Sequence, residues 1–443
     1  MLAFSVEARR PRIAPAKNGR QIPAGCERGR NGWRDPASPK SLELDLPGRR
    51  LVIRANTRPL SLDLPPLDRV SEGAQGLVES YRCCLKTARL LAHPSRQVSG
   101  TGIMHLFNLT RQLIEIESIT PNEREVGDFL FGYLSAMAEQ YDGVVERMVV
   151  EPGRDNIFVR FGEPVTTLST HMDTVPPHVP FLEDEKFIWG RGACDTKGII
   201  AAMICAASRL LQQGHRDFGL LFVVGEERNS AGAYHAAGHP RGSRYLINGE
   251  PTENKLALGS KGALRYEVIA NGRMAHSAYP ELGDSAILRL LNALERIRRV
   301  ELPVDEVLGQ STLNIGLIHG GRAANVIPDE ARAELFVRVV GDVTDLRRVL
   351  EEAAAPDAQI REVLFIPAAK LGSLDGFETT VVAFTTDIPV FGGAWGQPFL
   401  IGPGSIHVAH TLEERVRKSD LVRAVSLYEQ MVKQLAAEAK GNG

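Results

Sequence analysis

The sequence predicts an α/β protein with a smaller α+β domain inserted into it, preceded by a long amino-terminal extension. Three observations support this prediction. After Met104, short β-rich runs alternate with helical patterns, which is typical of a sheet covered by helices. The segment 261–367 has a different order of elements. Residues 1–103 show no sustained hydrophobic period, except near residues 76–92.

The first 103 residues differ in composition from the rest of the chain. They hold 18 Lys/Arg, 9 Asp/Glu and 10 of the 26 prolines, whereas the other residues hold 34 Lys/Arg and 45 Asp/Glu. A basic nucleic-acid-binding arm is one interpretation of this charge. We favour a disordered or non-native extension, with Met104 as a plausible true start, and expect no nucleic-acid partner.

The remaining bulk properties exclude several classes of protein. No apolar run reaches about 18 residues, so no transmembrane helix and no membrane partner are expected. The apolar stretch at the amino terminus is too short for a secretory signal. The five cysteines have no zinc-ribbon spacing and favour a reducing, cytoplasmic setting.

The first predicted domain begins with two helices. One apolar helical face comprises Leu106, Leu109, Leu113 and Ile116. The stretch "TPNE" then predicts a capping box, with Thr120 as N-cap, Pro121 at the first helical position and Glu123 closing the box.

A series of short strands follows. Those predicted for this domain are 156–161, 165–170, 219–224 and 245–248, with a helix at 198–213. We assign residues 104–260 to the first part of this domain and residues 368–443 to its second part, which ends in a helix at 418–439. Helices are expected on both faces of the sheet.

The segment between these two parts, residues 261–367, predicts the inserted domain. Its predicted elements are a strand at 262–270, a helix capped near Asp284, strands at 312–318 and 331–340, a helix at 345–354 and a strand at 360–365. This β-α-β-β-α-β order is typical of a ferredoxin-like unit.

Polar side chains follow several of the predicted strands. "STHMDTVPP" places an imidazole and a carboxylate two residues apart, on one face of a strand end. In open α/β sheets, ligands bind beyond the carboxyl ends of the strands. The residues expected to converge there are His171, Asp173, Asp195, Glu226, Glu227, Glu250 and His410.

Each of these residues alone is more often a cap, a turn or a solvated side chain. Together they would crowd several carboxylates, which repel one another unless cations are present. Imidazoles and carboxylates without thiolates suit zinc, cobalt or manganese. A pair of such ions needs a bridging carboxylate. The pattern therefore predicts a metal site.

The motifs resemble those of a known family. They are "STHMDTVPP", "WGRGACDTKGIIAAM", "VVGEERNSAG", "NGEPT", "RMAHSAYPELGDSAI", "GGRAANVIPD" and "GPGSIHVAHTLEE", in family order over residues 104–443. The sequence is similar to the co-catalytic zinc metallopeptidases and deacylases that include acetylornithine deacetylase, succinyl-diaminopimelate desuccinylase and carboxypeptidase G. The resemblance implies a mixed-sheet catalytic domain, with the inserted unit serving as lid and dimerisation domain.

The resemblance also implies the metal ligands. His171 and His410 would each bind one of two zinc ions, cobalt being possible, and Asp195 would bridge the pair. Glu227 and Glu250 would complete the two sites. His407 is a rival to His410, but the context "AHT" favours His410.

Further roles come from the same resemblance. Asp173 would orient His171, and Glu226 would take a proton from the attacking water and return it to the leaving amine. A cis peptide is expected between Asp195 and Thr196.

For substrate contact, the resemblance implies three positions in the lid, and a glycine loop adds two more. In the lid they are His276, which would act across a homodimer, Asn325 and Arg338. In the second part of the catalytic domain, the backbone N–H groups of Gly402 and Gly404 would face a substrate carboxylate. Ser405 and Ile406 depart from the family pattern, which leaves the substrate open.

The expected activity is metal-dependent removal of an acyl group from an N-acyl amino acid, most like acetylornithine deacetylase. Succinyl-diaminopimelate desuccinylase, carrier-protein lysine deacylase and dipeptidase activities remain alternatives within the family. A catalytically dead binding protein is the alternative from another class, but such relatives usually lose metal ligands, and all five are present here with the base.

Overall fold

The computed structural model describes residues 102–441 and, before them, only the backbone of five short strands. These strands are β1 (Arg28–Gly29), β2 (Gly32–Trp33), β3 (Leu42–Asp45), β4 (Arg50–Ala55) and β5 (Arg58–Asp63). The chain divides into two units, Met1–Ala88 and Arg89–Gly443, each considered on its own. In the first unit, β3, β4 and β5 form an antiparallel sheet. Most of the predicted extension, 1–103, lies outside the described residues, so that expectation stays a prediction.

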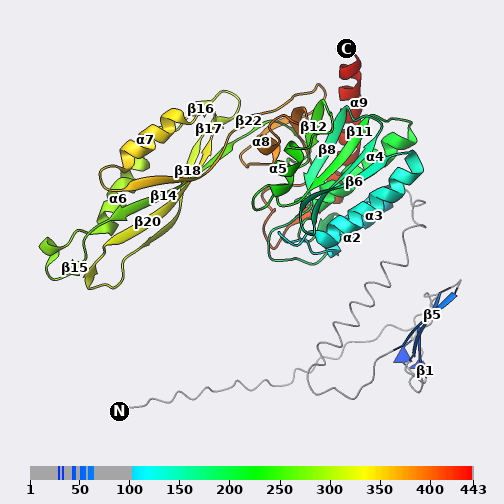
Figure 1. Cartoon of the computed structure of the whole chain (residues 1–443), viewed down its shortest axis with the longest axis horizontal. Coiled ribbons are helices and arrows are strands. Elements are labelled where there is room, and N and C mark those ends of the chain that lie inside the picture. Colours follow the sequence, from blue (N-terminus) through cyan, green and yellow to red (C-terminus); the bar gives the residue numbers. More distant parts are fainter. Residues whose placement is uncertain are drawn as a thin grey trace. The chain divides into compact units, whose positions relative to one another are not determined.

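The second unit contains a six-stranded mixed sheet, which includes the four strands predicted from the sequence and has the mixed character that the resemblance implied. Its strands are β6 (Val144–Glu151), β7 (Arg154–Phe161), β8 (Thr166–His171), β11 (Phe218–Val223), β12 (Tyr245–Asn248) and β24 (Gln397–Leu400). Their order is β24-β12-β8-β11-β7-β6 (Figure 1). Strands β24, β12, β8 and β11 run parallel, whereas β7 and β6 are antiparallel to their neighbours.

Helices bury both faces of this sheet. Four pack together on one face: α2 (Gly102–Glu115), α3 (Arg124–Tyr141), α4 (Lys197–Gln212) and α9 (Lys418–Gly441). Two shorter ones, α5 (Ala231–Ala237) and α8 (Ile388–Phe391), lie on the other. Alternate side chains of β11 accordingly enter different cores, Leu220 the first and Leu221 the second.

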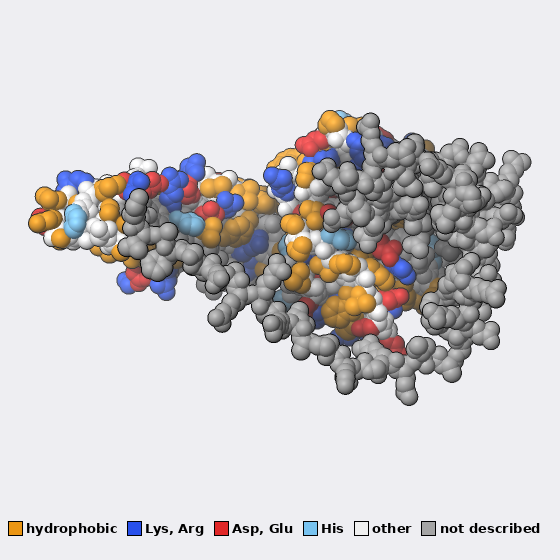
Figure 2. Space-filling view, turned by 90° about the horizontal axis from the view of Figure 1, so that it is seen from below, with side chains coloured by type: hydrophobic (Ala, Val, Ile, Leu, Met, Phe, Trp, Pro, Cys, Tyr) orange, Lys and Arg blue, Asp and Glu red, His pale blue; other side chains and the backbone are white. Residues whose placement is uncertain are grey.

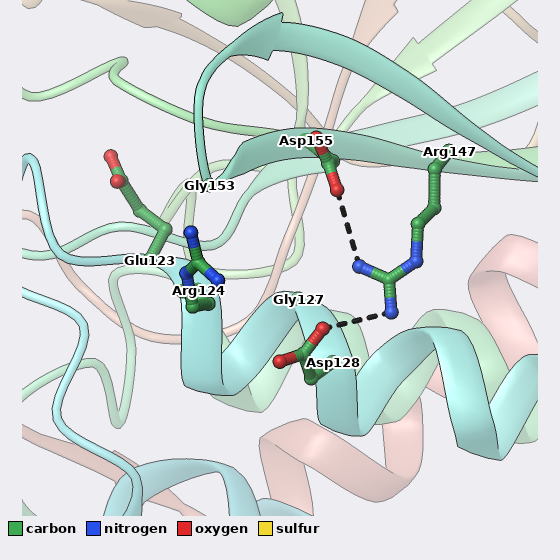
Figure 3. Close-up of a pocket in the computed structure, with 7 residues that line it drawn as sticks. All are labelled: Glu123, Arg124, Gly127, Asp128, Arg147, Gly153 and Asp155. Atoms are coloured by element: carbon green, nitrogen blue, oxygen red, sulfur yellow. Dashed lines mark hydrogen bonds and ion pairs between the residues drawn. The ribbon is translucent and has the colours of Figure 1, made fainter.

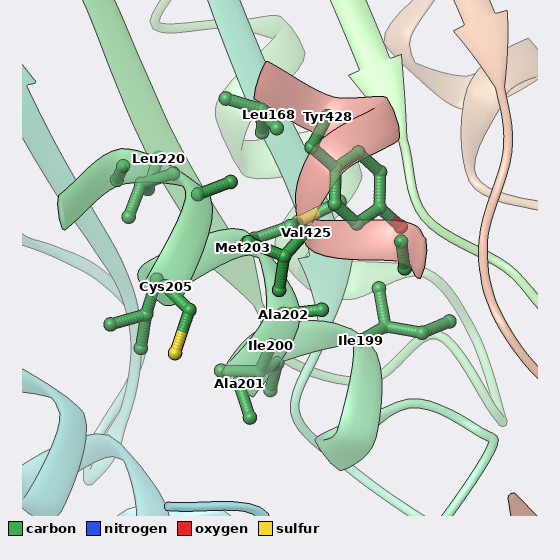
Figure 4. Packing of buried hydrophobic residues seen from close by; sticks show 14 of the residues in the cluster. Leu168, Ile199, Ile200, Ala201, Ala202, Met203, Cys205, Leu220, Val425 and Tyr428 are labelled. Atoms are coloured by element: carbon green, nitrogen blue, oxygen red, sulfur yellow. The ribbon is translucent and has the colours of Figure 1, made fainter. Parts of the chain in front are cut away.

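The larger core centres on α4. Figure 4 shows Met203 and its neighbours between the strand residues Leu168 and Leu220 and the α9 residues Val425 and Tyr428. Because α4 is apolar nearly all round, it is buried on almost every side. The Tyr428 hydroxyl donates to the Ile401 carbonyl at 2.9 Å, which fixes α9 to the loop after β24. The core thus holds the start of α4, where Asp195 lies, in a fixed place.

A four-stranded antiparallel sheet with two helices forms a separate core. Its elements are β14 (Gly262–Asn271), α6 (Ala286–Ile297), β18 (Thr312–Gly320), β20 (Glu330–Val339), α7 (Thr344–Ala354) and β21 (Gln359–Ile366). The strand order β18-β20-β14-β21 is that of a ferredoxin-like unit. Helix α6 begins after Ser285, whose hydroxyl accepts the Leu288 N–H, one residue later than the Asp284 cap expected from sequence.

Small sheets complete the unit. One comprises β9 (Leu182–Glu183), β10 (Phe187–Trp189) and β25 (Arg415–Arg417), and another β13 (Leu256–Ser260), β22 (Ala369–Lys370) and β23 (Thr379–Val382). Two-stranded pairs are β15 (Ala275–His276) with β19 (Val326–Ile327) and β16 (Val304–Asp305) with β17 (Gly309–Gln310). Over the described part of the chain, no helix is long and apolar enough to cross a membrane.

The capping box predicted at "TPNE" is wrong. Helix α3 begins at Arg124, and the N-cap residue Glu123 makes no side-chain cap. Its carboxylate instead accepts two hydrogen bonds from buried Arg154, at 2.6 and 2.8 Å. The Thr120 hydroxyl donates to Asp173 at 2.6 Å. Tertiary partners therefore outcompete the local cap, because both side chains have a charged partner in the core.

Candidate metal centre

The predicted polar residues meet at the carboxyl edge of the parallel strands. His171 ends β8 and pairs in register with Val223, the last residue of β11. Glu226 and Glu227 follow Val223, and Glu250 follows the end of β12, the other neighbour of β8. Parallel pairing places these strand ends side by side, so residues far apart in sequence share one site.

Asp195 lies at the centre of this site. One of its carboxylate oxygens is 3.0 Å from Nε2 of His171, and the other is 3.2 Å from Nε2 of His410. The side chain is almost fully buried, at 6% exposure. The peptide between Asp195 and Thr196 is cis, as the resemblance implied. A carboxylate contacted on both oxygens by imidazoles has the arrangement that a bridging ligand needs.

Glu227 lies beside His410 in the candidate metal site. Its carboxylate oxygens lie 3.0 and 3.1 Å from Nε2 of His410. Single ligand atoms of His171, Asp195 and Glu227 all lie within 4.8 Å of one another, close enough to surround an ion. His410 has a positive φ of 62° and a half-exposed side chain, whereas His407 contacts none of these residues. The structure therefore places His410, not His407, beside Asp195.

Glu250 lies on the His171 side and is 4% exposed. One of its carboxylate oxygens, Oε1, is buried without a hydrogen-bond partner. A buried carboxylate oxygen left unpaired is costly, and a metal ligand is a common reason for one. Burial raises the pKa of Glu250 well above its usual range, and the negative charge of Asp195 raises it further.

The charge balance of the site also fits divalent cations. Hydrogen bonds with Asp195 and Glu227 raise the pKa of His410 to about 10, because these carboxylates favour a positive charge there. Burial acts to raise the pKa of Asp195, but its contacts with both histidines hold it below the usual range. The same carboxylates would attract a pair of divalent cations bound between them. Two imidazoles, three carboxylates and no thiolate form a donor set suited to zinc or cobalt.

Asp173 contacts both His171 and the backbone of Glu226 and Glu227. The Nδ1 atom of His171 faces it, 3.0 Å from the backbone oxygen and 3.5 Å from Oδ1. Its two carboxylate oxygens accept the backbone N–H groups of Glu226 and Glu227, at 3.1 and 3.2 Å. A proton on Nδ1 leaves the Nε2 lone pair of His171 directed toward Asp195, which is the tautomer that a metal requires.

Glu226 differs from the other acidic residues of the site. Its carboxylate makes no hydrogen bond to any residue that the structure describes. Burial raises its pKa well above the usual range, and Glu250 and Asp387 raise it further, while His171 opposes them. A carboxyl group without a hydrogen-bond partner beside a metal site is free to exchange a proton, as a general acid–base group must.

Two of the predicted substrate residues are neighbours in the ferredoxin-like unit. His276 ends β15 and pairs with Val326 of β19, and Asn325 accepts a backbone hydrogen bond from Ser277. Both side chains are exposed. Among the described residues, no hydrogen bond, ion pair or ring contact joins them to the metal-site residues, so their roles stay predictions.

Arg338 lies on β20 of the same unit. It is half-buried, its Nη1 atom has no hydrogen-bond partner, and its guanidinium stacks over the Phe336 ring at 4.7 Å. Burial lowers its pKa. A sheltered guanidinium nitrogen without a partner is suited to a carboxylate.

The glycine loop is only partly as predicted. The Gly402 N–H donates to the Thr252 hydroxyl at 3.0 Å, so it is not free to bind a substrate carboxylate here. Gly402 also packs against the Glu250 carbonyl so tightly that a Cβ atom would come within 2.5 Å of it. Gly404 is buried and has a φ of 86°. These glycines hold the loop against the Glu250 segment, because a side chain at Gly402 would collide with it.

Two acidic residues beside the site were not predicted. Asp387 is buried next to the cluster, and Glu414 accepts the backbone N–H of Asp195. The signal for Asp387 was present in "TTDIP", where a carboxylate again follows a short β-rich run. Burial raises the pKa of Asp387 to about 6. Ser230 approaches it and opposes this rise, but neither carboxylate oxygen has a partner with ordinary hydrogen-bond geometry.

A separate polar pocket of about 200 Å³ lies at the start of α3 and holds none of the predicted metal ligands. It is lined by Glu123, Arg124, Gly127, Asp128, Arg147, Gly153 and Asp155 (Figure 3). Arg147 forms ion pairs with Asp128 and Asp155 across it, at 2.8 and 3.2 Å. Carboxylates of the pocket thus neutralise Arg147.

Comparisons with known proteins agree with this geometry. The model of Peptidase family M20/M25/M40 matches residues 167–434, more than half of the chain. The chain belongs to the M20 peptidase family. A Peptidase M20 domain-containing protein of Schizosaccharomyces pombe is 38% identical over 78% of this chain and 88% of its own length. A probable carboxypeptidase of Aspergillus flavus is 34% identical over 74% of this chain and 89% of its own length.

Solved structures of M20 and related peptidases share the fold. A tripeptidase of Staphylococcus aureus aligns with a TM-score of 0.63 and 23% identity, covering 76% of this chain and 99% of its own. A Bacillus subtilis protein described as a dinuclear metal binding peptidase of the M20 family aligns with a TM-score of 0.56 and 18% identity, covering 76% and 99%. At these identities the alignments support the fold alone.

Proposed function

We propose that this M20 family member is a metal-dependent hydrolase of amide bonds that lie next to a free carboxylate. N-acyl amino acids and the carboxyl-terminal bond of short peptides share this chemical group. The observation that carries the proposal is Asp195, contacted on both oxygens by His171 and His410, with the unpaired carboxylate of Glu226 in the same cluster.

The ligands proposed for the metal pair are His171, Asp195, Glu227, Glu250 and His410. When bound, two zinc or cobalt ions would polarise the scissile carbonyl and acidify a water molecule. The protein's own contribution is proton transfer. Glu226 takes a proton from the attacking water and returns it to the leaving nitrogen, for which its carboxylate, without a hydrogen-bond partner among the described residues, is available. Asp173 holds His171 and the backbone of Glu226 in the geometry that this transfer needs.

The requirement for a free carboxylate on the substrate is proposed from Arg338 in the lid, the ferredoxin-like unit. Arg338 has a sheltered guanidinium nitrogen without a partner, which an anionic group could occupy. The relatives described as probable carboxypeptidases act, by that description, on substrates with a free carboxyl terminus. The specific activity most like acetylornithine deacetylase rests on the motif resemblance. Carboxypeptidase or dipeptidase activity has the support of these relatives' names.

We also propose a homodimer formed through the ferredoxin-like unit. Strand β18 is an edge strand, so its outer backbone groups are free to pair with a second copy. It exposes Leu317 and Ile318, and α6 exposes Leu288 and Leu291, each by about half or more. Figure 2 shows hydrophobic side chains gathered at several places on this part of the surface. Exposed apolar groups on an edge strand and its neighbouring helix favour association.

The test is a substrate panel with purified protein loaded with zinc or cobalt. It contains N-acetyl amino acids, including acetylornithine, short peptides, and the amide of each. We expect hydrolysis of the free acids, at least tenfold slower hydrolysis of the amides, and loss of activity with a chelator. Equal rates on acids and amides would overturn the carboxylate requirement. Full activity in the metal-free protein would overturn the mechanism.

A further inference from the structure

Glu414 is a buried carboxylate that the proposed reaction does not use. It lies four residues after His410 in the loop that leads to β25, and its side chain has no exposed surface. It contacts neither substrate nor metal in the proposed scheme. A charge buried this deeply is costly unless it has several partners.

The partners of Glu414 all belong to the segment that carries Asp195. Its Oε1 atom accepts the backbone N–H groups of Cys194 and Asp195, at 3.3 and 3.2 Å. Its Oε2 atom accepts from Nη1 of Arg191 at 2.6 Å. The Glu414 carbonyl also accepts the Gly190 N–H at 3.1 Å. One residue thus contacts both ends of the turn before α4.

Arg191 extends these contacts to the segment after β8. It is 1% exposed, its Nε atom donates to the Pro177 carbonyl at 3.2 Å, and its backbone N–H donates to Val179 at 3.0 Å. The pair therefore joins the segment that follows His171 to the loops that carry Asp195 and His410.

We propose that Glu414 is a positioning residue that holds the bridging carboxylate of Asp195 in place relative to His410. A bridging ligand must reach two ions about 3.5–4 Å apart, so a small shift of its backbone affects both. Two N–H donors on Oε1 fix that backbone, and the short connection to His410 sets the distance between the two loops. This inference rests on the proposed function, since it concerns the same metal pair.

A simpler role must be separated from this one. Glu414 could serve only to neutralise buried Arg191, in which case any change that removes both charges would be harmless. Two double variants distinguish the roles. Arg191→Met with Glu414→Gln removes the ion pair but keeps a side-chain oxygen for the two N–H groups. Arg191→Met with Glu414→Met removes that oxygen as well.

The measurement is zinc affinity of the chelated and dialysed protein, by calorimetric titration, with thermal melting of the metal-free form. The melting temperature shows whether each double variant folds, and the Glu414→Met form should melt lower than the Glu414→Gln form because two buried N–H groups lose their acceptor. We expect the Glu414→Met form to bind zinc at least tenfold more weakly than the Glu414→Gln form, in the range typical of groups that support metal ligands. Glu413→Gln is the matched control, since Glu413 is adjacent and 80% exposed. Its zinc affinity should equal that of the wild type.

Equal zinc affinity in the two double variants would overturn the proposal. Failure of the wild type to bind zinc would instead overturn the proposed function, so the two failures are distinguishable. If the variants do not fold, hydrogen exchange of the metal-free wild type supplies the test. Peptides containing Cys194 and Asp195 should exchange slowly before metal is added. Fast exchange there would show that Glu414 does not hold this backbone.

Discussion

The Thr120 hydroxyl donates a 2.6 Å hydrogen bond to Oδ2 of Asp173, across 53 positions of sequence. The loop between α2 and α3 is further joined to this strand end by backbone hydrogen bonds of Thr174 with Ser118 and Thr120. Asp173 is therefore oriented by the Thr120 hydroxyl as well as by the backbone N–H groups of Glu226 and Glu227. Thr120, which was expected to cap a helix, instead supports the candidate active site.

Thr120→Val should weaken the reaction without unfolding the protein. A hydrogen bond to a charged group contributes about 1.5–3 kcal/mol, so kcat/KM should fall by roughly tenfold or more. The measurement is kcat/KM together with the melting temperature. Thr110→Val is the control, because within the described residues the buried Thr110 hydroxyl bonds only to the Leu106 carbonyl of its own helix. An equal loss of activity in both variants would argue against a role for the contact with Asp173.

Glu226→Gln should keep its metal and lose its activity. The carboxamide cannot accept the proton of the attacking water, and general acid–base groups typically contribute about a hundredfold or more. Metal content and single-turnover rate are measured on the same sample. Glu185→Gln, a change at an exposed residue, should leave both unaltered. Retention of the full rate by Glu226→Gln would exclude this residue as the base.

Asp387→Asn should stabilise the metal-free protein in a pH-dependent way. Burial raises the pKa of Asp387 from 3.8 to about 6, so the fold favours the protonated carboxyl. The cost of ionising it is absent below about pH 4 and grows as the pH rises to about 6. The gain from Asn should reach about 3 kcal/mol at most, by urea unfolding at pH 7, and vanish near pH 4.

Replacing a second aspartate, Asp184, should change the stability in the opposite direction. The backbone N–H groups of Phe187 and Lys186 lower the pKa of exposed Asp184. Asp184→Asn should therefore lose stability at neutral pH and lose none at a pH below the folded-state pKa.

If Asp387→Asn shows no gain in stability at pH 7, burial does not disfavour the ionised form of Asp387.

His276 is expected to act in the partner subunit's site. His276→Ala should reduce kcat by roughly a hundredfold or more, as for other groups that stabilise a developing oxyanion. Mixing His276→Ala with Glu226→Gln subunits should restore part of the activity, since one site of the mixed dimer then has both groups.

The control mixes Glu226→Gln subunits with subunits that carry both substitutions, which leaves no complete site. No recovery in the first mixture, under conditions where subunit exchange is demonstrated, would place the action of His276 within its own subunit. A monomeric wild type in solution would contradict the dimer itself.

Periodicity in the sequence predicted four of the six strands of the main sheet, but it missed β6 and β24. The strand at 245–248 has the predicted limits, and β8 and β11 differ by one residue at each end. For β11 and β12 this succeeds because strands buried on both faces are mainly apolar runs that end at polar residues. The five metal-ligand candidates came from the motif resemblance, and of these only His171, Glu227 and Glu250 also lie at or just after strands predicted from the sequence.

The contacts between these elements were decided only by the tertiary structure. The sequence gives no sign that Thr120 faces Asp173 or that Glu123 pairs with Arg154, because a local cap and a distant partner compete for the same side chain. Glu414 and Asp387 were missed because single acidic residues in loops are usually solvated. Only folding buries them, and burial determines both the hydrogen bonds they must make and the protonation state they favour.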